Sequence, residues 1–134
     1  MALGVRGVTT LLEVYDMQAS LRFYRDLLGF EVVHSWGLAD QLSWVRLRAG
    51  DSSLMLNTAY NAGRRPVSPD ATRVSGHVDT ELYFECADAD HAYTYLRARG
   101  CDVKAPVVSY YGMKQVWLQD PDGFQVCLQS PSVE

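Results

Sequence analysis

Acidic side chains recur at matching positions in two short segments of the chain, residues 9–14 and 81–86. Because the side chains of a strand point alternately to its two faces, Glu13, Glu81 and Glu85 are expected on the polar faces of two strands. Carboxylates beside aromatic rings attract cationic or planar polar molecules through charge pairing and cation–π contact. These faces are therefore candidates for a binding site, although such glutamates can equally be solvated or paired with arginine.

Aromatic, amide and thiol side chains are expected on the same faces. In residues 81–86, Tyr83 alternates with the apolar residues and so lies beside the glutamates. The same alternation places Asn57 opposite the apolar residues of 53–58, and Cys127 opposite those of 124–129. The other aromatic candidates for ligand contact are Trp36, Trp44, Tyr111 and Trp117.

The residues that serve as nucleophiles and bases elsewhere are sparse here. The chain has three histidines, and His34 and His91 are expected to be surface or hydrogen-bonded residues. His77, beside Asp79, is as well suited to the mouth of a site as to a structural role. No Ser-His-Asp arrangement is apparent, and Cys127 has no obvious histidine to activate it.

Composition excludes several classes of protein. The 134 residues are 48% hydrophobic and 21% charged, which fits a single globular domain spanning 1–134. The net charge of −4 argues against binding to a nucleic-acid backbone. No apolar run reaches the roughly 18 residues of a membrane-spanning helix. Three cysteines without paired spacing favour a reduced, cytoplasmic protein.

An internal repeat organises the chain. Residues 9–32 align with residues 81–103 when Asp16 is placed over Asp88. Each copy has an alternating strand pattern, an Asp suited to cap a helix, about three turns of amphipathic helix and a closing Gly. The repeat therefore predicts two copies of one module.

Three further strands are expected after each helix, so each module is βαβββ. The expected strands are residues 31–36, 42–48 and 53–58, and then 102–109, 114–119 and 124–129. The first module is taken as 6–58 and the second as 79–131. Residues 59–78 have little periodicity and are predicted to be a linker that could close over a pocket.

The segment VYDMQASLRFYRDLLGF, the helix DADHAYTYLRARG and the hairpin QDPDGFQV resemble the vicinal oxygen chelate superfamily. This superfamily includes glyoxalase I, bleomycin-resistance proteins and extradiol dioxygenases. The resemblance covers essentially the whole chain. It implies an α+β fold in which two tandem βαβββ modules form curved mixed sheets around a cavity, and it implies a homodimer.

The resemblance also locates the positions that hold metal ligands in metal-dependent members. In this chain those positions carry Thr9, Glu81 and Cys127, and the repeat places Met55 at the fourth. Divalent ions in such sites prefer imidazole and carboxylate ligands, and here one carboxylate and no histidine is present. We therefore expect no cofactor. The alternative is a divalent metal site built around Glu81 and Cys127.

The sequence thus predicts metal-independent binding, or sequestration, of a small cationic or aromatic organic molecule, with no nucleic-acid or membrane partner. The alternative is a metal-dependent lyase, isomerase or dioxygenase with an atypical ligand set. The predicted ligand-binding residues are Glu13, Trp36, Trp44, Asn57, Glu81, Tyr83, Glu85, Tyr111, Trp117 and Cys127.

Overall fold

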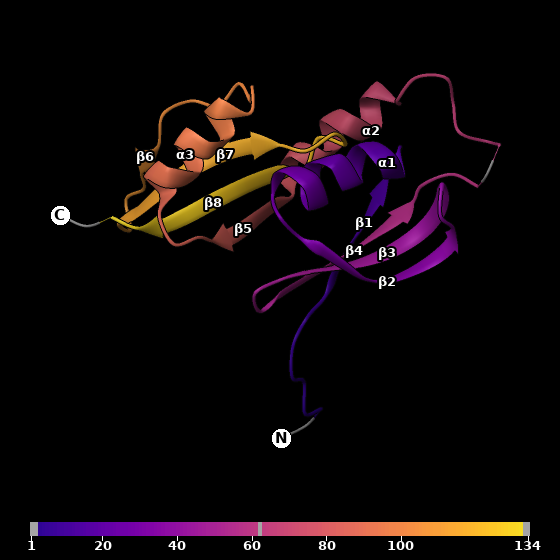
Figure 1. Cartoon of the computed structure of the whole chain (residues 1–134), viewed down its shortest axis with the longest axis horizontal. Coiled ribbons are helices and arrows are strands. Elements are labelled where there is room, and N and C mark those ends of the chain that lie inside the picture. Colours follow the sequence, from indigo (N-terminus) through magenta and orange to yellow (C-terminus); the bar gives the residue numbers. More distant parts are fainter. Residues whose placement is uncertain (1–2, 62, 133–134) are drawn as a thin grey trace. The chain divides into compact units, whose positions relative to one another are not determined.

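The computed structural model describes residues 3–61 and 63–132. The chain divides into two compact units, unit 1 (Met1–Arg65) and unit 2 (Pro66–Glu134). Each unit contains one four-stranded mixed sheet with helical segments, drawn from indigo to magenta for unit 1 and from rose to yellow for unit 2 (Figure 1). The predicted α+β fold with two βαβββ modules is therefore confirmed, and each sheet is open rather than closed into a barrel.

Unit 1 follows the predicted order of elements. These are β1 (Thr10–Val14), α1 (Met17–Leu21), η1 (Arg22–Leu27), β2 (Glu31–Leu38), β3 (Gln41–Ala49) and β4 (Ser52–Thr58). The strand order in the sheet is β1-β4-β3-β2, and β1 runs parallel to its neighbour β4. The first and last strands of the module therefore lie side by side.

The helix of unit 1 begins and ends as the sequence predicts. The carboxylate of Asp16 accepts hydrogen bonds from the backbone N–H groups of Gln18 and Ala19 at 3.0 and 3.3 Å, which satisfies donors that a helix start leaves unpaired. The helix widens into a π-helix over η1 and ends before Gly29, whose φ of 87° is in the left-handed region. The side chains of Leu21 and Tyr24, on the buried side of this helix, contribute to the core.

Unit 2 repeats this arrangement after two short helical segments. Its elements are α2 (Ala71–Gly76), η2 (His77–Asp79), β5 (Glu81–Glu85), α3 (Ala89–Ala98), β6 (Val107–Val108), β7 (Met113–Gln119) and β8 (Gln125–Pro131). The strand order is β5-β8-β7-β6, again with the first and last strands parallel. Asp88 caps α3 as Asp16 caps α1, which confirms the alignment of the repeat at these two positions.

Each sheet buries one face against its helices. In unit 1, α1 packs on β3 and β4, and in unit 2, α3 packs on β7 and β8. The buried apolar side chains on these faces are Leu12, Val14, Val45, Leu47, Leu54, Leu56, Val116 and Val126. Burial of an aliphatic side chain contributes about 1.5–3 kcal/mol, so these faces hold the sheets against their helices. The opposite face of each sheet, here called the open face, carries the polar positions of the strands.

Two predicted segments differ from the structure. The strand expected over 102–109 pairs only at Val107 and Val108, because Val103 turns inward to a buried position and Pro106 has no N–H to donate. The segment 59–78, expected to be an irregular linker, contains α2 and most of η2. Asp70 starts α2 by accepting from the N–H groups of Thr72 and Arg73.

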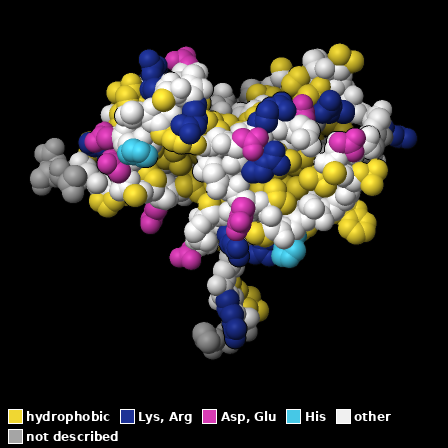
Figure 2. All heavy atoms as spheres, in the orientation of Figure 1, with side chains coloured by type: hydrophobic (Ala, Val, Ile, Leu, Met, Phe, Trp, Pro, Cys, Tyr) yellow, Lys and Arg dark blue, Asp and Glu magenta, His cyan; other side chains and the backbone are white. Residues whose placement is uncertain are grey.

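Charged side chains of both signs are interspersed on the face drawn in Figure 2. Among the described residues, no helix has the length and apolar character needed to span a membrane.

Candidate functional site

Four of the predicted ligand residues form one row across the open face of unit 1. Successive strands pair Glu13 with Asn57, Asn57 with Trp44, and Trp44 with Trp36. The Nδ2 of Asn57 donates to both carboxylate oxygens of Glu13 at 3.3 Å. Trp36, on the edge strand β2, is 74% exposed. The row therefore presents a carboxylate at one end and two indole rings at the other.

A second row crosses the open face of unit 2. Tyr83 pairs with Cys127, and Cys127 pairs with Trp117. The rings of Tyr83 and Trp117 meet edge to face, with centroids 5.4 Å apart and planes at 82°. Cys127 lies between them and is fully buried, with 0% exposure. Two aromatic rings thus cover the thiol predicted to face the site.

Glu81 contacts this second row through a hydrogen bond with Tyr83. The hydroxyl of Tyr83 donates to the Oε1 of Glu81 at 2.8 Å. This hydrogen bond stabilises the protonated phenol and raises the pKa of Tyr83 to about 12. Glu81 was expected to be solvated, paired with arginine or available to a ligand, and the structure instead gives it a tyrosine partner.

Glu85 and Tyr111 flank a pair of amides in unit 2. Glu85 pairs with Gln129 across β5 and β8, and Gln129 pairs with Gln115 across β8 and β7. The Nε2 of Gln115 donates to the Tyr111 hydroxyl at 2.8 Å and to the Oε1 of Gln129 at 3.0 Å. This row is the repeat equivalent of the Glu13 row, with Gln129 in the place of Asn57. The ten predicted residues therefore fall into two groups, four in unit 1 and six in unit 2.

The metal-ligand positions of unit 2 fit a metal ion poorly. Glu81 and Cys127 lie on neighbouring strands but two residues out of register, because Glu81 pairs with Gln125 and Cys127 with Tyr83. A metal needs the thiolate form of cysteine, whereas burial raises the pKa of Cys127 to about 11. Over residues 3–61 and 63–132, no three His, Cys, Asp or Glu side chains gather as a metal site.

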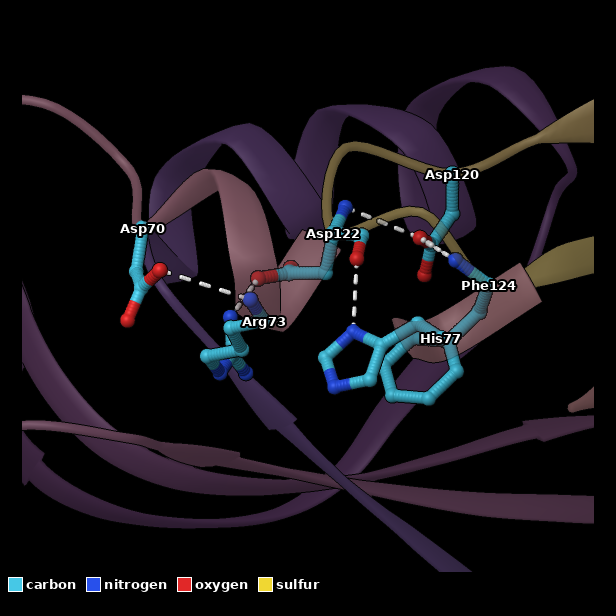
Figure 3. A network of polar contacts seen from close by, with 6 residues as sticks. All are labelled: Asp70, Arg73, His77, Asp120, Asp122 and Phe124. Carbon is cyan, nitrogen blue, oxygen red and sulfur yellow. Dashed lines mark hydrogen bonds and ion pairs between the residues drawn. The ribbon is translucent and has the colours of Figure 1, made fainter. Parts of the chain in front are cut away.

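His77 has a structural role in unit 2. Its ring stacks on Phe124 with centroids 3.9 Å apart, and its Nδ1 lies 2.6 Å from the backbone oxygen of Asp122, to which it donates (Figure 3). The Nη1 of Arg73 lies 2.8 Å from the carboxylate of Asp122. These contacts hold α2 and η2 against the turn between β7 and β8.

A hollow of about 510 Å³ in unit 1 was not predicted. It is formed by the start of α1, the β2–β3 turn and the segment after β4. Tyr15 contacts the ring of Tyr60 edge to face and carries the guanidinium of Arg65 at 5.0 Å from its centroid. Because Tyr60 and Arg65 lie in the segment interpreted as a linker, strand and helix periodicity gave no signal for them.

The chain is therefore an α+β protein with two modules that share the same strand order and each have one open polar face. Residues 8–128 match the family model of the Glyoxalase/Bleomycin resistance protein/Dioxygenase superfamily. The chain therefore belongs to this superfamily, as its motifs indicated. No curated protein sequence matches the chain.

Solved structures show the same fold over nearly the whole chain. TnmS3, an antibiotic binding protein from Streptomyces sp. CB03234, is 22% identical, with 97% of this chain and 99% of that chain covered and a TM-score of 0.70. A bleomycin resistance determinant encoded on the transposon Tn5 is 21% identical, with 96% and 100% covered and a TM-score of 0.65. Lactoylglutathione lyase from Agrobacterium tumefaciens is 25% identical, with 92% of each chain covered and a TM-score of 0.65.

Proposed function

We propose that the protein binds a small organic molecule on its open sheet faces without a metal ion. The observation that carries this proposal is the row Glu13–Asn57–Trp44–Trp36, in which a carboxylate and two indoles share one face. Such a row suits a planar aromatic molecule that carries a positive charge. The antibiotic-binding and bleomycin-resistance structures with this fold support binding rather than turnover.

The absence of a suitable ligand set supports metal independence. The four positions that bear ligands in metal-dependent relatives hold Thr9, Met55, Glu81 and Cys127. The thiol of Cys127 is buried and strongly favours its protonated form, and the Glu81 carboxylate already accepts from Tyr83. Binding of a divalent ion at these positions would have to overcome both effects.

The experiment measures metal content and ligand binding on the same preparation. We expect elemental analysis to find no stoichiometric divalent metal, and we expect acriflavine, a planar aromatic cation, to quench the tryptophan fluorescence. Trp44→Leu should weaken this quenching, whereas Tyr95→Leu, on α3 and away from the open faces, serves as the control and should leave it unchanged. Acriflavine and a panel of cationic antibiotics that all fail to quench would contradict the proposal.

The alternative is a metal-dependent lyase, isomerase or dioxygenase that uses Glu81 and Cys127. The likeness to lactoylglutathione lyase is the observation in its favour. Glu81→Gln tests this alternative, because it removes the one carboxylate at the predicted metal-ligand positions. Loss of a bound metal and of turnover together in this variant would establish the enzyme.

We also propose that the protein is a homodimer, with module boundaries of 6–58 and 79–131. Large apolar side chains are exposed on the edge strands of both sheets, including Trp36 and Leu38 on β2 and Val107 and Val108 on β6. Exposed apolar side chains at sheet edges favour association with another surface. Sedimentation velocity of the purified protein should give the mass of two chains, and a monomer at all concentrations would refute the dimer.

A further inference from the structure

We propose that the open face of unit 1 carries an anion subsite centred on Arg46, which holds an acidic group of the bound aromatic molecule. The ligand is then an amphoteric aromatic compound, which carries an acidic group in addition to the positive charge that suits the tryptophan row. This inference rests on the proposed function, because it concerns the same sheet face as the tryptophan row.

The subsite is a hollow of about 550 Å³ at the β3–β4 end of the sheet. Cationic, imidazole and hydroxyl groups converge on it from β2, β3 and β4. Its lining residues are Val33, His34, Arg46, Arg48, Gly50, Asp51, Ser52 and Ser53. The volume is within the range that small ligands occupy, roughly 300–1,000 Å³.

Arg46 is a partly buried cation whose partner among the described residues is a neutral hydroxyl. Its Nε donates to the Oγ of Ser53 at 2.8 Å, and no carboxylate of the described chain lies within ion-pair distance of it. Its neighbour Arg48, by contrast, pairs with Glu31 at 2.8 Å. Partial removal of a charge from water is unfavourable unless an opposite charge compensates it. An anion in the hollow would supply that compensation.

The neighbours of Arg46 add donors rather than acceptors. His34 is its direct partner across β2 and β3, and Arg48 lies two residues further along the same face. The acidic residue of the lining, Asp51, is in the exposed turn between β3 and β4. The guanidinium of Arg46, with its planar fork of donors, matches carboxylate, sulfonate and phosphate groups.

The subsite adjoins the tryptophan row. Trp44 precedes Arg46 by two residues on β3, and Trp36 follows His34 by two residues on β2. Two residues of a strand span about 7 Å. One small molecule can therefore lay an aromatic ring against the indoles and extend an acidic group to Arg46.

Two dyes that differ by one sulfonate test this inference. 8-Anilinonaphthalene-1-sulfonate carries the anionic group, and N-phenyl-1-naphthylamine is the same ring system without it. We expect the sulfonate dye to bind at least about tenfold more tightly to the wild-type protein, as a hydrogen-bonded ion pair implies. Arg46→Gln should abolish this preference, and Arg97→Gln, on α3 of unit 2, should keep it.

A second measurement, an NMR titration of the wild-type protein, requires neither the dyes nor a correctly folded variant. Inorganic sulfate should shift the Arg46 Nε–H resonance of the wild-type protein in a saturable titration. Equal binding of the two dyes, or a preference that survives Arg46→Gln, overturns the subsite, whereas acriflavine quenching still upholds the proposed function. If neither dye binds, a sulfate titration without a shift overturns the subsite, and the acriflavine experiment decides the proposed function.

Discussion

The ion pair between Arg73 and Asp122 should be the most sensitive polar contact of unit 2. The Nη1 of Arg73 lies 2.8 Å from the Oδ1 of Asp122, and the two side chains are 18% and 1% exposed. Arg73→Met keeps much of the side-chain volume and removes the cation. A buried carboxylate that loses its partner costs about 3–5 kcal/mol, which is a large part of the stability of a small domain.

The exposed pair Arg25–Asp26 provides a matched control in unit 1. Its atoms are also 2.8 Å apart, but its side chains are 42% and 51% exposed. Water already solvates these charges, so Arg25→Met should cost less than about 1 kcal/mol. The comparison therefore varies burial at a constant distance.

Urea unfolding followed by far-ultraviolet circular dichroism measures both free-energy changes. The double variant Arg73→Met/Asp122→Leu should recover part of the lost stability, because it removes the carboxylate that the single change leaves without its cation. If Arg73→Met destabilises no more than Arg25→Met, burial does not determine the strength of this pair and the reasoning is wrong.

Three further changes test other contacts. Glu81→Gln should lower the pKa of Tyr83 from about 12 toward its usual value near 10, measured by phenolate absorbance, because the charged acceptor is lost. Burial raises the pKa of the Cys127 thiol to about 11, so this thiol should resist labelling by a thiol reagent at about pH 8. The same shift means that the protonated thiol contributes stability below its unfolded pKa of 9.0, and that this contribution is lost as the pH rises toward 11. Gly123→Ala should destabilise more in urea than Gly29→Ala, because both glycines have positive φ but only Gly123 has backbone atoms against its missing Cβ.

Each of these has its own control. Glu85→Gln should leave the titration of Tyr83 unchanged, and an unchanged titration in Glu81→Gln would exclude the hydrogen bond. Cys127→Ala should flatten the loss of stability at alkaline pH, whereas an equal slope would assign that loss to other groups. Gly29→Ala should cost only the strain of a left-handed residue, about 1–2 kcal/mol.

The sequence predicted which residues share a face better than which residues lie side by side. Alternation placed Glu13 and Asn57 on the open face, because a period of two is visible in a single strand. Their contact depends on the register between β1 and β4, which is set by long-range pairing and turn geometry. The row from Glu13 to Trp36 therefore became visible only in the structure.

The elements that sequence reasoning missed are those whose form depends on tertiary contacts. The helix α2 has no buried side chain and a short span, so its pattern in the sequence is weak, and its contacts with the β7–β8 turn come from Arg73 and His77. The shortness of β6 likewise follows from the inward turn at Val103. Similarly, the register of β2 against β3 places Glu31 beside Arg48 and not beside Arg46. Among residues 3–61 and 63–132, Arg46 therefore has no carboxylate within ion-pair distance.

The parallel pairing of the first and last strand in each module has a consequence for how the chain folds. Every strand pair is made within its own unit, and the antiparallel pairs β2–β3 and β3–β4 join neighbours in the sequence. The β1–β4 and β5–β8 pairs must close loops of some forty residues. Closing these longer loops costs more conformational entropy than forming a hairpin, so these pairs should form more slowly. We therefore expect hairpins to form early in both halves and each first strand to dock late, so that refolding shows two independent nucleation events.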